Sequence, residues 1–156
     1  MKSKVHSYQS HLTWTGNQGE GTKSYRSYDR SYEINVGEKP SLQGSSDPHF
    51  MGDPSKYNPE ELLVMALSGC HMLWYLHLCS VNHIVVETYE DAAQGIMQEN
   101  PDGSGEFTGV VLSPRVKISS GDIDLAIELH KKAHHLCFIA RSVNFSVKNE
   151  PEVSEA

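Results

Sequence analysis

Short runs of alternating apolar and polar residues open the chain, and a period of two is typical of a half-buried β-strand. Residues 5–15 and residues 25–36 both alternate in this way, and the turn sequence GNQGEG separates them. Arg26 and Arg30 fall on the apolar side of the second run. Because a buried guanidinium needs a partner, the simpler interpretation is that one of them lies near the strand end and extends to water.

A stretch rich in Gly, Pro and Ser, residues 37–57, predicts a long loop. Loops of this length in small domains often form a wall or lid of a site, although this one could contain a short strand or helical turn. Asn58 then suits a helix N-cap, Pro59 suits the first helical position, and the next two glutamates suit the positive end of a helix. These signals predict a helix from Pro59 to Cys79 or Val81.

Alternation returns after this helix. Residues 84–97 enter with IVVETY, and residues 107–118 follow the loop NPDGSG. Both runs predict strands, the second with a candidate break near Pro114. The loop between them predicts an antiparallel hairpin.

A second helix is predicted next, because apolar residues recur at helical spacing after a cap on Ser120 or Asp122. It ends around residues 134–137. Residues 142–148 alternate again as a last strand, and the polar residues 149–156 predict a loose tail. The order β–β–loop–α–β–β–α–β predicts an α+β fold with antiparallel pairing.

Length and composition support one globular domain over residues 1–156. The chain has 156 residues, 38% hydrophobic and 21% charged, and a chain of this size can bury roughly two-thirds of its unfolded surface. A net charge of −7 without a basic cluster argues against binding to nucleic acid or to an anionic membrane. The start MKSKVHSYQSH lacks the apolar core of a secretory signal, so a cytoplasmic location with reduced cysteines is expected.

One apolar run, residues 62–78, lies inside the first predicted helix. Its length is at the lower limit for a membrane span, and it contains Ser68, Gly69, His71 and His77. Because no other segment resembles a span, a fully buried helix of a soluble protein is the favoured interpretation. A helix that is apolar on all sides needs cover on every side, which a second copy of the chain would supply.

Three cysteines are present, Cys70, Cys79 and Cys137. An odd number of cysteines does not indicate a disulfide framework. The three are therefore either a reactive pair with one uninvolved thiol, or three core thiols. Cys70 follows two small residues that would let a substrate approach, and Cys137 ends the second predicted helix, so these two could form a redox pair if the fold brings them together. Cys79 lies ~13 Å further along the helix than Cys70, too far to bridge, and is expected to be core packing.

Two rival chemistries are weaker. Cys79 with His83, and His134 with Cys137, have spacings that could bind zinc. The chain has nine histidines but no CxxC and no HExxH, so we expect no metal site. A serine nucleophile is not supported, because GxSxG is absent and LSGCH lies within a helix.

Two segments carry a resemblance to a known family. NPEELLVMALSGCHMLWYLHLC and AHHLCFIARSVNFSV resemble the OsmC/Ohr family of organic hydroperoxide reductases, with its N-P-E-x-L segment, small-residue run and cysteine, and its A-H-x-x-C segment. The resemblance covers nearly the whole chain. It implies an OsmC-like α+β fold, with two central helices packed against antiparallel sheets in an intertwined homodimer.

The resemblance also implies an activity. Family members reduce organic hydroperoxides with a pair of thiols and take electrons from a dithiol such as dihydrolipoamide, without metal or bound cofactor. Carried onto this chain, Cys70 would be the peroxidatic thiol, Cys137 the resolving thiol, and Glu60 the carboxylate that holds an activating arginine. Attack requires a thiolate, which a guanidinium beside a sulfur stabilises, and the sulfenic acid formed would then close to a disulfide.

The activating arginine is the open point. The loop before Asn58, HFMGDPSKY, contains no arginine, and Phe138 follows Cys137 where family members commonly have Pro. Arg30 is favoured over Arg26, and Arg141 is a third option. Without an arginine at Cys70 the alternative is a non-enzymatic, dimeric ligand-binding stress protein on the same fold.

Glu60 and Cys70 raise a related question of distance. They are separated by ~15 Å along one helix, so they cannot share an arginine within one helix. If two copies of the helix cross in a dimer, Glu60 of one chain could approach Cys70 of the other.

Overall fold

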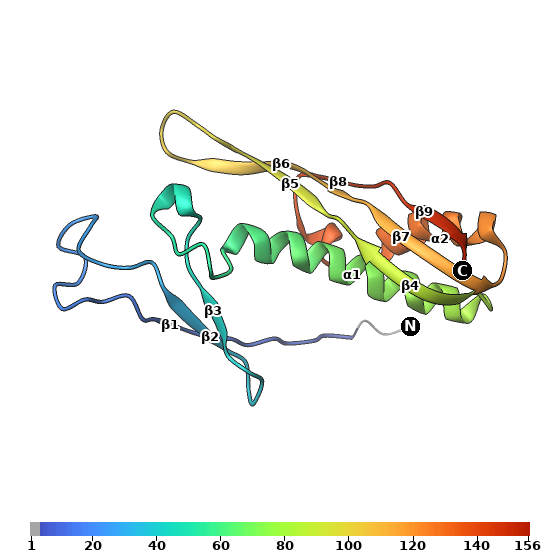
Figure 1. The fold of residues 1–156 in the computed structure, drawn as a ribbon, viewed down its shortest axis with the longest axis horizontal. Helices are drawn as coiled ribbons and strands as arrows, with labels where there is room; N and C mark the ends of the chain where they lie inside the picture. Colours follow the sequence, from blue (N-terminus) through green and yellow to red (C-terminus); the bar gives the residue numbers. More distant parts are fainter. Residues whose placement is uncertain (1–3) are drawn as a thin grey trace. The chain divides into compact units, whose positions relative to one another are not determined.

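The computed structural model describes residues 4–156 and divides the chain into two compact units (Figure 1). The first unit ends at Leu62, and the second is Leu63–Ala156. The boundary lies inside helix α1 (Pro59–Val81), which begins and ends as the sequence predicts.

The first unit contains a three-stranded antiparallel sheet in the order β1-β2-β3 and the 3-10 turn η1. Gly44 on β3 is required there, because a Cβ at this position would lie 2.2 Å from the Tyr32 ring on β2. These elements are β1 (His11–Trp14), β2 (Tyr32–Asn35), β3 (Leu42–Gly44) and η1 (Pro48–Phe50).

The start of α1 is held by a reciprocal cap. Asn58 Oδ1 accepts a hydrogen bond from the Glu61 backbone N–H at 2.8 Å, and Glu61 Oε2 accepts one from the Asn58 N–H at 3.1 Å. Two of the N–H groups that a helix start leaves unpaired are thereby satisfied.

The strand expected over residues 25–36 is shorter than predicted, and this changes the position of two arginines. Only Tyr32–Asn35 forms a strand, while the chain around Arg26 turns back on itself. The Ser27 hydroxyl donates to the Gly21 carbonyl at 3.0 Å, and such local side-chain bonds compete with strand pairing. The expectation that Arg26 and Arg30 share the inward face of a strand is therefore wrong.

The second unit contains most of α1, the second helix α2 and two three-stranded sheets, β4-β7-β9 and β5-β6-β8. Asp122 caps α2, with Oδ1 accepting from the Leu125 N–H at 2.9 Å, as one of the two predicted caps. The elements are β4 (Val85–Asp91), β5 (Gln94–Glu99), β6 (Gly105–Leu112), β7 (Pro114–Ser120), α2 (Ile123–Leu136), η2 (Ala140–Ser142), β8 (Ser146–Asn149) and β9 (Glu152–Glu155).

The predicted hairpin is confirmed, with both of its arms divided. β4 pairs antiparallel with β7, and β5 with β6. The break before Pro114 lies beside Asp91, whose carboxylate accepts from the Ser113 N–H at 2.7 Å. The α+β class is confirmed, but the pairing is not wholly antiparallel, because β8 and β9 add to the two sheets in parallel.

The expectation of a loose tail at residues 149–156 is wrong. Glu152–Glu155 forms β9 along β7, and the Ala156 N–H donates to the Ile118 carbonyl at 2.9 Å. Val153 packs against the core, and this contact gives the otherwise polar segment an inward face.

The core of the second unit has two parts. The larger part joins the C-terminal half of α1 to α2, β4 and β7, and the smaller part joins α1 to β6 and the segment after α2 (Figure 1). α1 contributes five buried residues to this interior, Leu67, His71, Tyr75, Leu78 and Cys79. Cys79 is therefore core packing, as expected.

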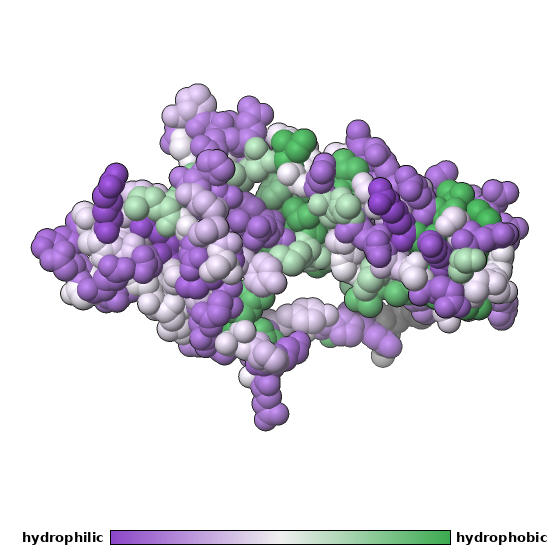
Figure 2. Space-filling view, viewed as in Figure 1, coloured by the Kyte–Doolittle hydropathy of each residue, from purple (hydrophilic) through white to green (hydrophobic). Residues whose placement is uncertain are grey.

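α1 is long and apolar enough to cross a membrane by length and composition alone. Its inward side packs on sheets and on α2, which is the behaviour of a core helix. Its outward side still exposes apolar residues, with Leu73 65% and Met65 45% exposed. Hydrophobic side chains are likewise visible at the surface in Figure 2.

Candidate functional site

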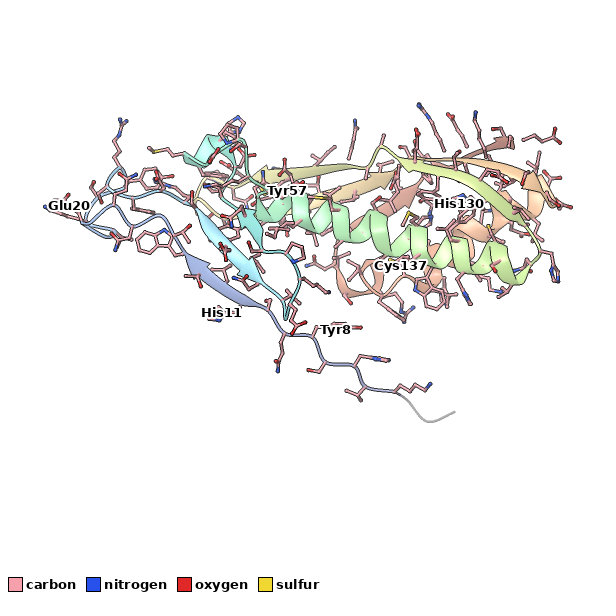
Figure 3. All side chains as sticks on the ribbon, turned by 60° about the horizontal axis from the view of Figure 1, so that its bottom comes forward. Tyr8, His11, Glu20, Tyr57, His130 and Cys137 are labelled. Carbon is pink, nitrogen blue, oxygen red and sulfur yellow. The ribbon has the colours of Figure 1, made fainter. Side chains whose placement is uncertain are left out.

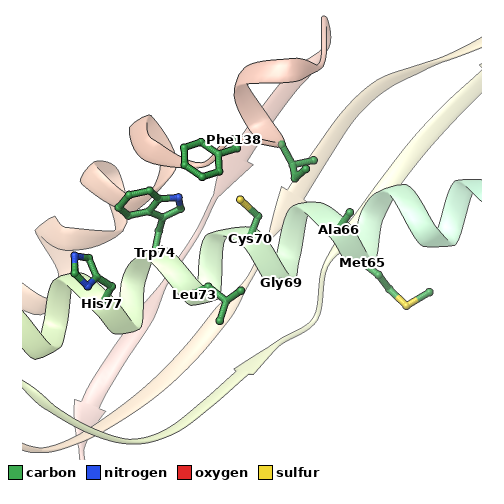
Figure 4. Close-up of a pocket in the computed structure, with 9 residues that line it drawn as sticks. Met65, Ala66, Gly69, Cys70, Leu73, Trp74, His77 and Phe138 are labelled. Carbon is green, nitrogen blue, oxygen red and sulfur yellow. The ribbon is translucent and has the colours of Figure 1, made fainter. Parts of the chain in front are cut away.

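Cys70 lies half-buried in an apolar groove of about 690 Å³ at the middle of α1 (Figure 4). One face of α1 supplies most of the wall, because residues three, four and seven apart share a face of a helix. A Cβ built on Gly69 would meet no atom within 4 Å, so the groove is open beside the sulfur. The lining residues are Met65, Ala66, Gly69, Cys70, Leu73, Trp74, His77, Phe138 and Ile139.

Cys137 is brought to Cys70 from the end of α2. It is 1% exposed, and its Sγ accepts a hydrogen bond from the Ala140 N–H at 3.4 Å. Burial, and then a hydrogen bond with the Cys70 side chain, raises the pKa of Cys137 to about 11. All three cysteines are free thiols in the structure. The fold thus brings an accessible thiol and a buried, protonated thiol close to each other, as a redox pair requires.

Phe138 and Trp74 close the groove on the side of Cys137. Their rings pack edge to face with centroids 5.5 Å apart, a favourable geometry for aromatic rings. Phe138 stands where the resemblance led us to expect Pro, and 66% of it is exposed. Its contribution is a wall of the groove that holds Cys70.

The arginine candidates are distributed over both units. Arg30 donates to the carbonyls of Tyr28 at 2.7 Å and Tyr25 at 2.6 Å, and its guanidinium lies 4.1 Å and 4.4 Å from the centroids of the Tyr25 and Tyr28 rings. Arg26 is exposed in the turn before it, and Arg141 is exposed in η2. Among the described residues, none that lines the groove is an arginine.

Glu60 lies half-buried in the first turn of α1, in the first unit. Burial, and then the negative charge of Glu60, raises the pKa of the Tyr32 hydroxyl. Ten residues of helix separate Glu60 from Cys70, which is ~15 Å along the axis.

A pair of buried histidines behind the groove was missed by sequence reasoning. His71, the residue after Cys70, is buried in the core, and its Nε2 lies 3.0 Å from Nδ1 of His130 on α2. Figure 3 labels His130. The His130 ring stacks on Tyr75 with centroids 3.7 Å apart. The available signal was the helical spacing of His130 with the apolar residues Ala126, Leu129 and Ala133, which places it on the inward face of α2.

Burial lowers the pKa of both histidines, because it penalises their charged forms. The pKa of His71 falls to about 4, with a further decrease from His134 and a partial opposing effect of Asp91. The pKa of His130 falls to about 3, with His71 as the second cause. Both imidazoles are therefore neutral at physiological pH.

Metal binding has no geometric support in the part of the chain that the structure describes, residues 4–156. No group of three or more His, Cys, Asp or Glu side chains is arranged there to hold an ion. Cys79 is buried beside Tyr75, whereas His83 is exposed after the end of α1 with φ of 60°. The positions of Cys79 and His83 therefore do not support the zinc alternative.

Comparison with known proteins identifies the family. A model of the OsmC-like protein family matches residues 52–152. An OsmC-like protein of unknown function from Vibrio cholerae is 31% identical, with a TM-score of 0.85 over 95% of this chain and 100% of that one. No protein of curated function matches the sequence.

More distant structures share the fold. An organic hydroperoxide resistance protein OsmC from Legionella pneumophila is 18% identical, with a TM-score of 0.68 over 97% of this chain and 99% of that one. An organic hydroperoxide resistance protein from Elizabethkingia anophelis is 15% identical, with a TM-score of 0.71 over 99% of this chain and 100% of that one. The family model, the Vibrio structure and the paired thiols together lead to one conclusion: this chain belongs to the OsmC-like family.

Proposed function

We propose that the protein is a cysteine-based peroxidase that reduces organic hydroperoxides through a Cys70–Cys137 disulfide, in defence against oxidative or osmotic stress. The observation that carries this proposal is the proximity of a half-buried thiol in an apolar groove to a second, buried thiol. The names of the more distant structures, which include hydroperoxide resistance proteins, agree with it.

The proposed roles follow from accessibility. The Cys70 thiolate attacks one peroxide oxygen, the O–O bond breaks, and the departing alkoxide takes a proton to leave as an alcohol. Cys70 is then a sulfenic acid. Cys137 attacks its sulfur, the hydroxide leaves as water, and the disulfide forms before further oxidation. An external dithiol such as dihydrolipoamide returns both thiols by exchange, so no bound cofactor is needed.

An arginine near Cys70 would stabilise the thiolate and the departing oxygen. Arg30, Arg26 and Arg141 are the candidates, and Glu60 would orient the chosen guanidinium. Single replacements of each arginine by glutamine, followed by the rate of the first oxidation step, identify it. We expect one variant of the three to lose at least tenfold.

We also propose that the protein works as a homodimer in the cytoplasm. The exposed apolar side chains of α1, including Leu73 and Met65, would be covered by a second copy. Glu60 of one chain would then approach Cys70 of the other, although the two residues lie far apart along one helix. A monomer in sedimentation at micromolar concentration is the result that contradicts the dimer.

The alternative is a non-enzymatic, dimeric ligand-binding stress protein. Its specific support is that the groove has no arginine among its lining residues and is almost wholly apolar. Counting free thiols after addition of an organic hydroperoxide separates the two. Loss of two thiols per chain, abolished in Cys70→Ser, supports the peroxidase, whereas unchanged thiols together with saturable binding of the hydroperoxide support the alternative.

A further inference from the structure

A polar cavity of about 390 Å³ lies within the first unit and shares no lining residue with the groove that holds Cys70. Three segments form its wall: residues 29–31 before β2, Ser45 after β3, and the loop after η1. Gly52 is required in that loop, because a Cβ there would overlap the Ser46 carbonyl. All three segments belong to the first unit, so the cavity lies wholly within it.

Arg30 brings a fixed guanidinium to the wall of this cavity. Of its five N–H groups, one donates to the Tyr28 carbonyl at 2.7 Å and one to the Tyr25 carbonyl at 2.6 Å, and the guanidinium lies over both tyrosine rings. None of the ion pairs among residues 4–156 includes Arg30, so no carboxylate compensates its charge. The remaining N–H groups lie in the guanidinium plane, the direction from which an oxyanion makes bidentate contacts.

Two hydroxyls and an ammonium add further donors to the same wall. Lys56 Nζ donates to Ser31 Oγ at 2.7 Å, and the Asp53 N–H donates to Ser45 Oγ at 3.0 Å. Because each hydroxyl oxygen accepts in its bond, each keeps its own O–H for another acceptor. Ser45 is 1% exposed, and a polar group buried to this extent is expected to use its hydrogen-bonding capacity.

Two carboxylates also line the cavity, and both have partners of their own. Asp53 Oδ1 accepts from the Ser55 N–H at 2.9 Å and the Ser55 hydroxyl at 2.7 Å, and its Oδ2 lies 3.4 Å from Lys56 Nζ. Asp29 is exposed, and its Oδ2 accepts from the Gln18 amide at 2.7 Å. With two positive and two negative side chains the lining is neutral, so an anion is held here by directed donors and not by net charge.

We propose that this cavity binds a phosphate group, as inorganic phosphate or as the phosphate of a small ester, through Arg30, Lys56 and the hydroxyls of Ser31 and Ser45. Donors from three segments suit a tetrahedral oxyanion, whose oxygens point in several directions, better than a carboxylate, whose two oxygens lie in one plane. The site goes beyond the proposed function and does not depend on a reaction at Cys70. While Arg30 holds a phosphate it is not available to a thiolate.

The test is calorimetric titration of the full-length, reduced protein at constant ionic strength with inorganic phosphate, glycerol 3-phosphate and acetate. The net charge of −7 disfavours non-specific binding of anions. We expect one saturable phosphate site per chain with a Kd near the millimolar range, clearly weaker binding of acetate, and phosphate-dependent shifts of the Ser45 and Gly52 amide signals in NMR spectra. The glycerol 3-phosphate titration shows whether the cavity takes esters as well as free phosphate.

Variants assign the binding to the cavity. Ser45→Ala and Lys56→Met each remove one donor and should weaken phosphate binding roughly tenfold. Arg30→Lys keeps the charge but loses the bidentate geometry and should also weaken it. Lys39→Met is the matched control, because Lys39 is exposed in the same unit and outside the cavity, and it should bind phosphate as the wild type does.

Cys70→Ser separates this inference from the proposed function, since it should lose peroxidase activity and still bind phosphate normally. The inference is overturned if phosphate shows no saturable binding, if acetate binds as tightly, or if Ser45→Ala and Arg30→Lys proteins with wild-type circular dichroism spectra keep the wild-type affinity.

Discussion

Nε2 of His71 lies 3.0 Å from Nδ1 of His130, and both rings are buried between α1 and α2. One ring donates and the other accepts in this contact, an arrangement that is lost when both rings are protonated, because a protonated imidazole has no acceptor nitrogen. The His71 Nδ1 and the His130 Nε2 have no hydrogen-bond partner among the described residues. A proton on either of these two nitrogens would therefore have no hydrogen-bond acceptor among the described residues.

Acid should destabilise the protein in a window set by these histidines. Their pKa values, about 4 and about 3, lie below the unfolded value of about 6.5, so the unfolded chain binds more protons as pH falls below 6.5. The free energy of unfolding should then decrease by up to roughly 1.4 kcal/mol per pH unit for each histidine. Urea unfolding at pH 7, 6 and 5 measures this decrease in the free energy of unfolding.

The window from pH 7 to pH 5 avoids the exposed carboxylates whose pKa values are lowered, such as Asp47, Asp53 and Asp102, because those titrate at lower pH. His71→Gln serves as the comparison, since it should be less stable at pH 7 but should show a shallower dependence on pH. A free energy of unfolding that is equal at pH 7 and pH 5 in the wild-type protein would contradict the assignment.

Replacing the two paired cysteines should have different consequences. Cys70→Ser should abolish reaction with hydroperoxide, because the groove thiol is lost. Cys137→Ser should still react once, leaving a sulfenic acid on Cys70 that gains the mass of one oxygen and reacts with a carbon nucleophile. Intact-protein mass spectrometry reads both outcomes.

Cys79→Ala is the control for this pair, since Cys79 is buried on the other side of α1 against Tyr75. It should lose stability but still lose two thiols per chain on oxidation. A Cys137→Ser protein that turns over repeatedly with a dithiol at the wild-type rate would show that Cys137 does not resolve the intermediate.

Alkylation should distinguish the two thiols before any peroxide is added. The raised pKa of Cys137, about 11, leaves little thiolate at pH 7.5, and its sulfur is buried, whereas Cys70 faces the groove. Iodoacetamide at pH 7.5 should therefore modify Cys70 well before Cys137, as peptide mapping over time would show. Equal rates at the two positions would mean that the buried thiol opens to solvent faster than it is labelled.

Gly69 offers a test of the groove wall. A Cβ there meets no atom within 4 Å, and alanine is favoured over glycine inside a helix by about 1 kcal/mol. Gly69→Ala should therefore raise the free energy of unfolding by up to that amount, and Gly69→Leu should raise KM for bulky hydroperoxides by filling space beside Cys70. Denaturation and kinetics with a small and a bulky hydroperoxide measure the two effects. Loss of stability in Gly69→Ala would instead indicate that the second copy proposed to cover Leu73 and Met65 also packs on Gly69.

Local signals in the sequence were sufficient for the helices. Asn58 and Glu61 cap each other, and Asp122 caps α2, because capping depends on residues within one turn. The antiparallel pairing of β4 with β7 and β5 with β6 also followed from two alternating runs around one loop. The position of Arg30 could not be predicted from local signals. Hydrogen bonds from Ser27 to neighbouring backbone carbonyls stabilise a turn where the alternating pattern predicted a strand.

By itself, the sequence determined the α+β class, the extent of α1, the cap of α2 and the family motifs around Cys70 and Cys137, since all of these are encoded in short stretches of chain. Only the tertiary structure decided that β9 joins β7, that His71 meets His130, and that Cys70 and Cys137 lie close to each other. Each of these relationships joins residues far apart in the chain. Their proximity depends on how α1, α2 and the sheets bury a common core. A local sequence pattern does not determine which distant residues meet in that core.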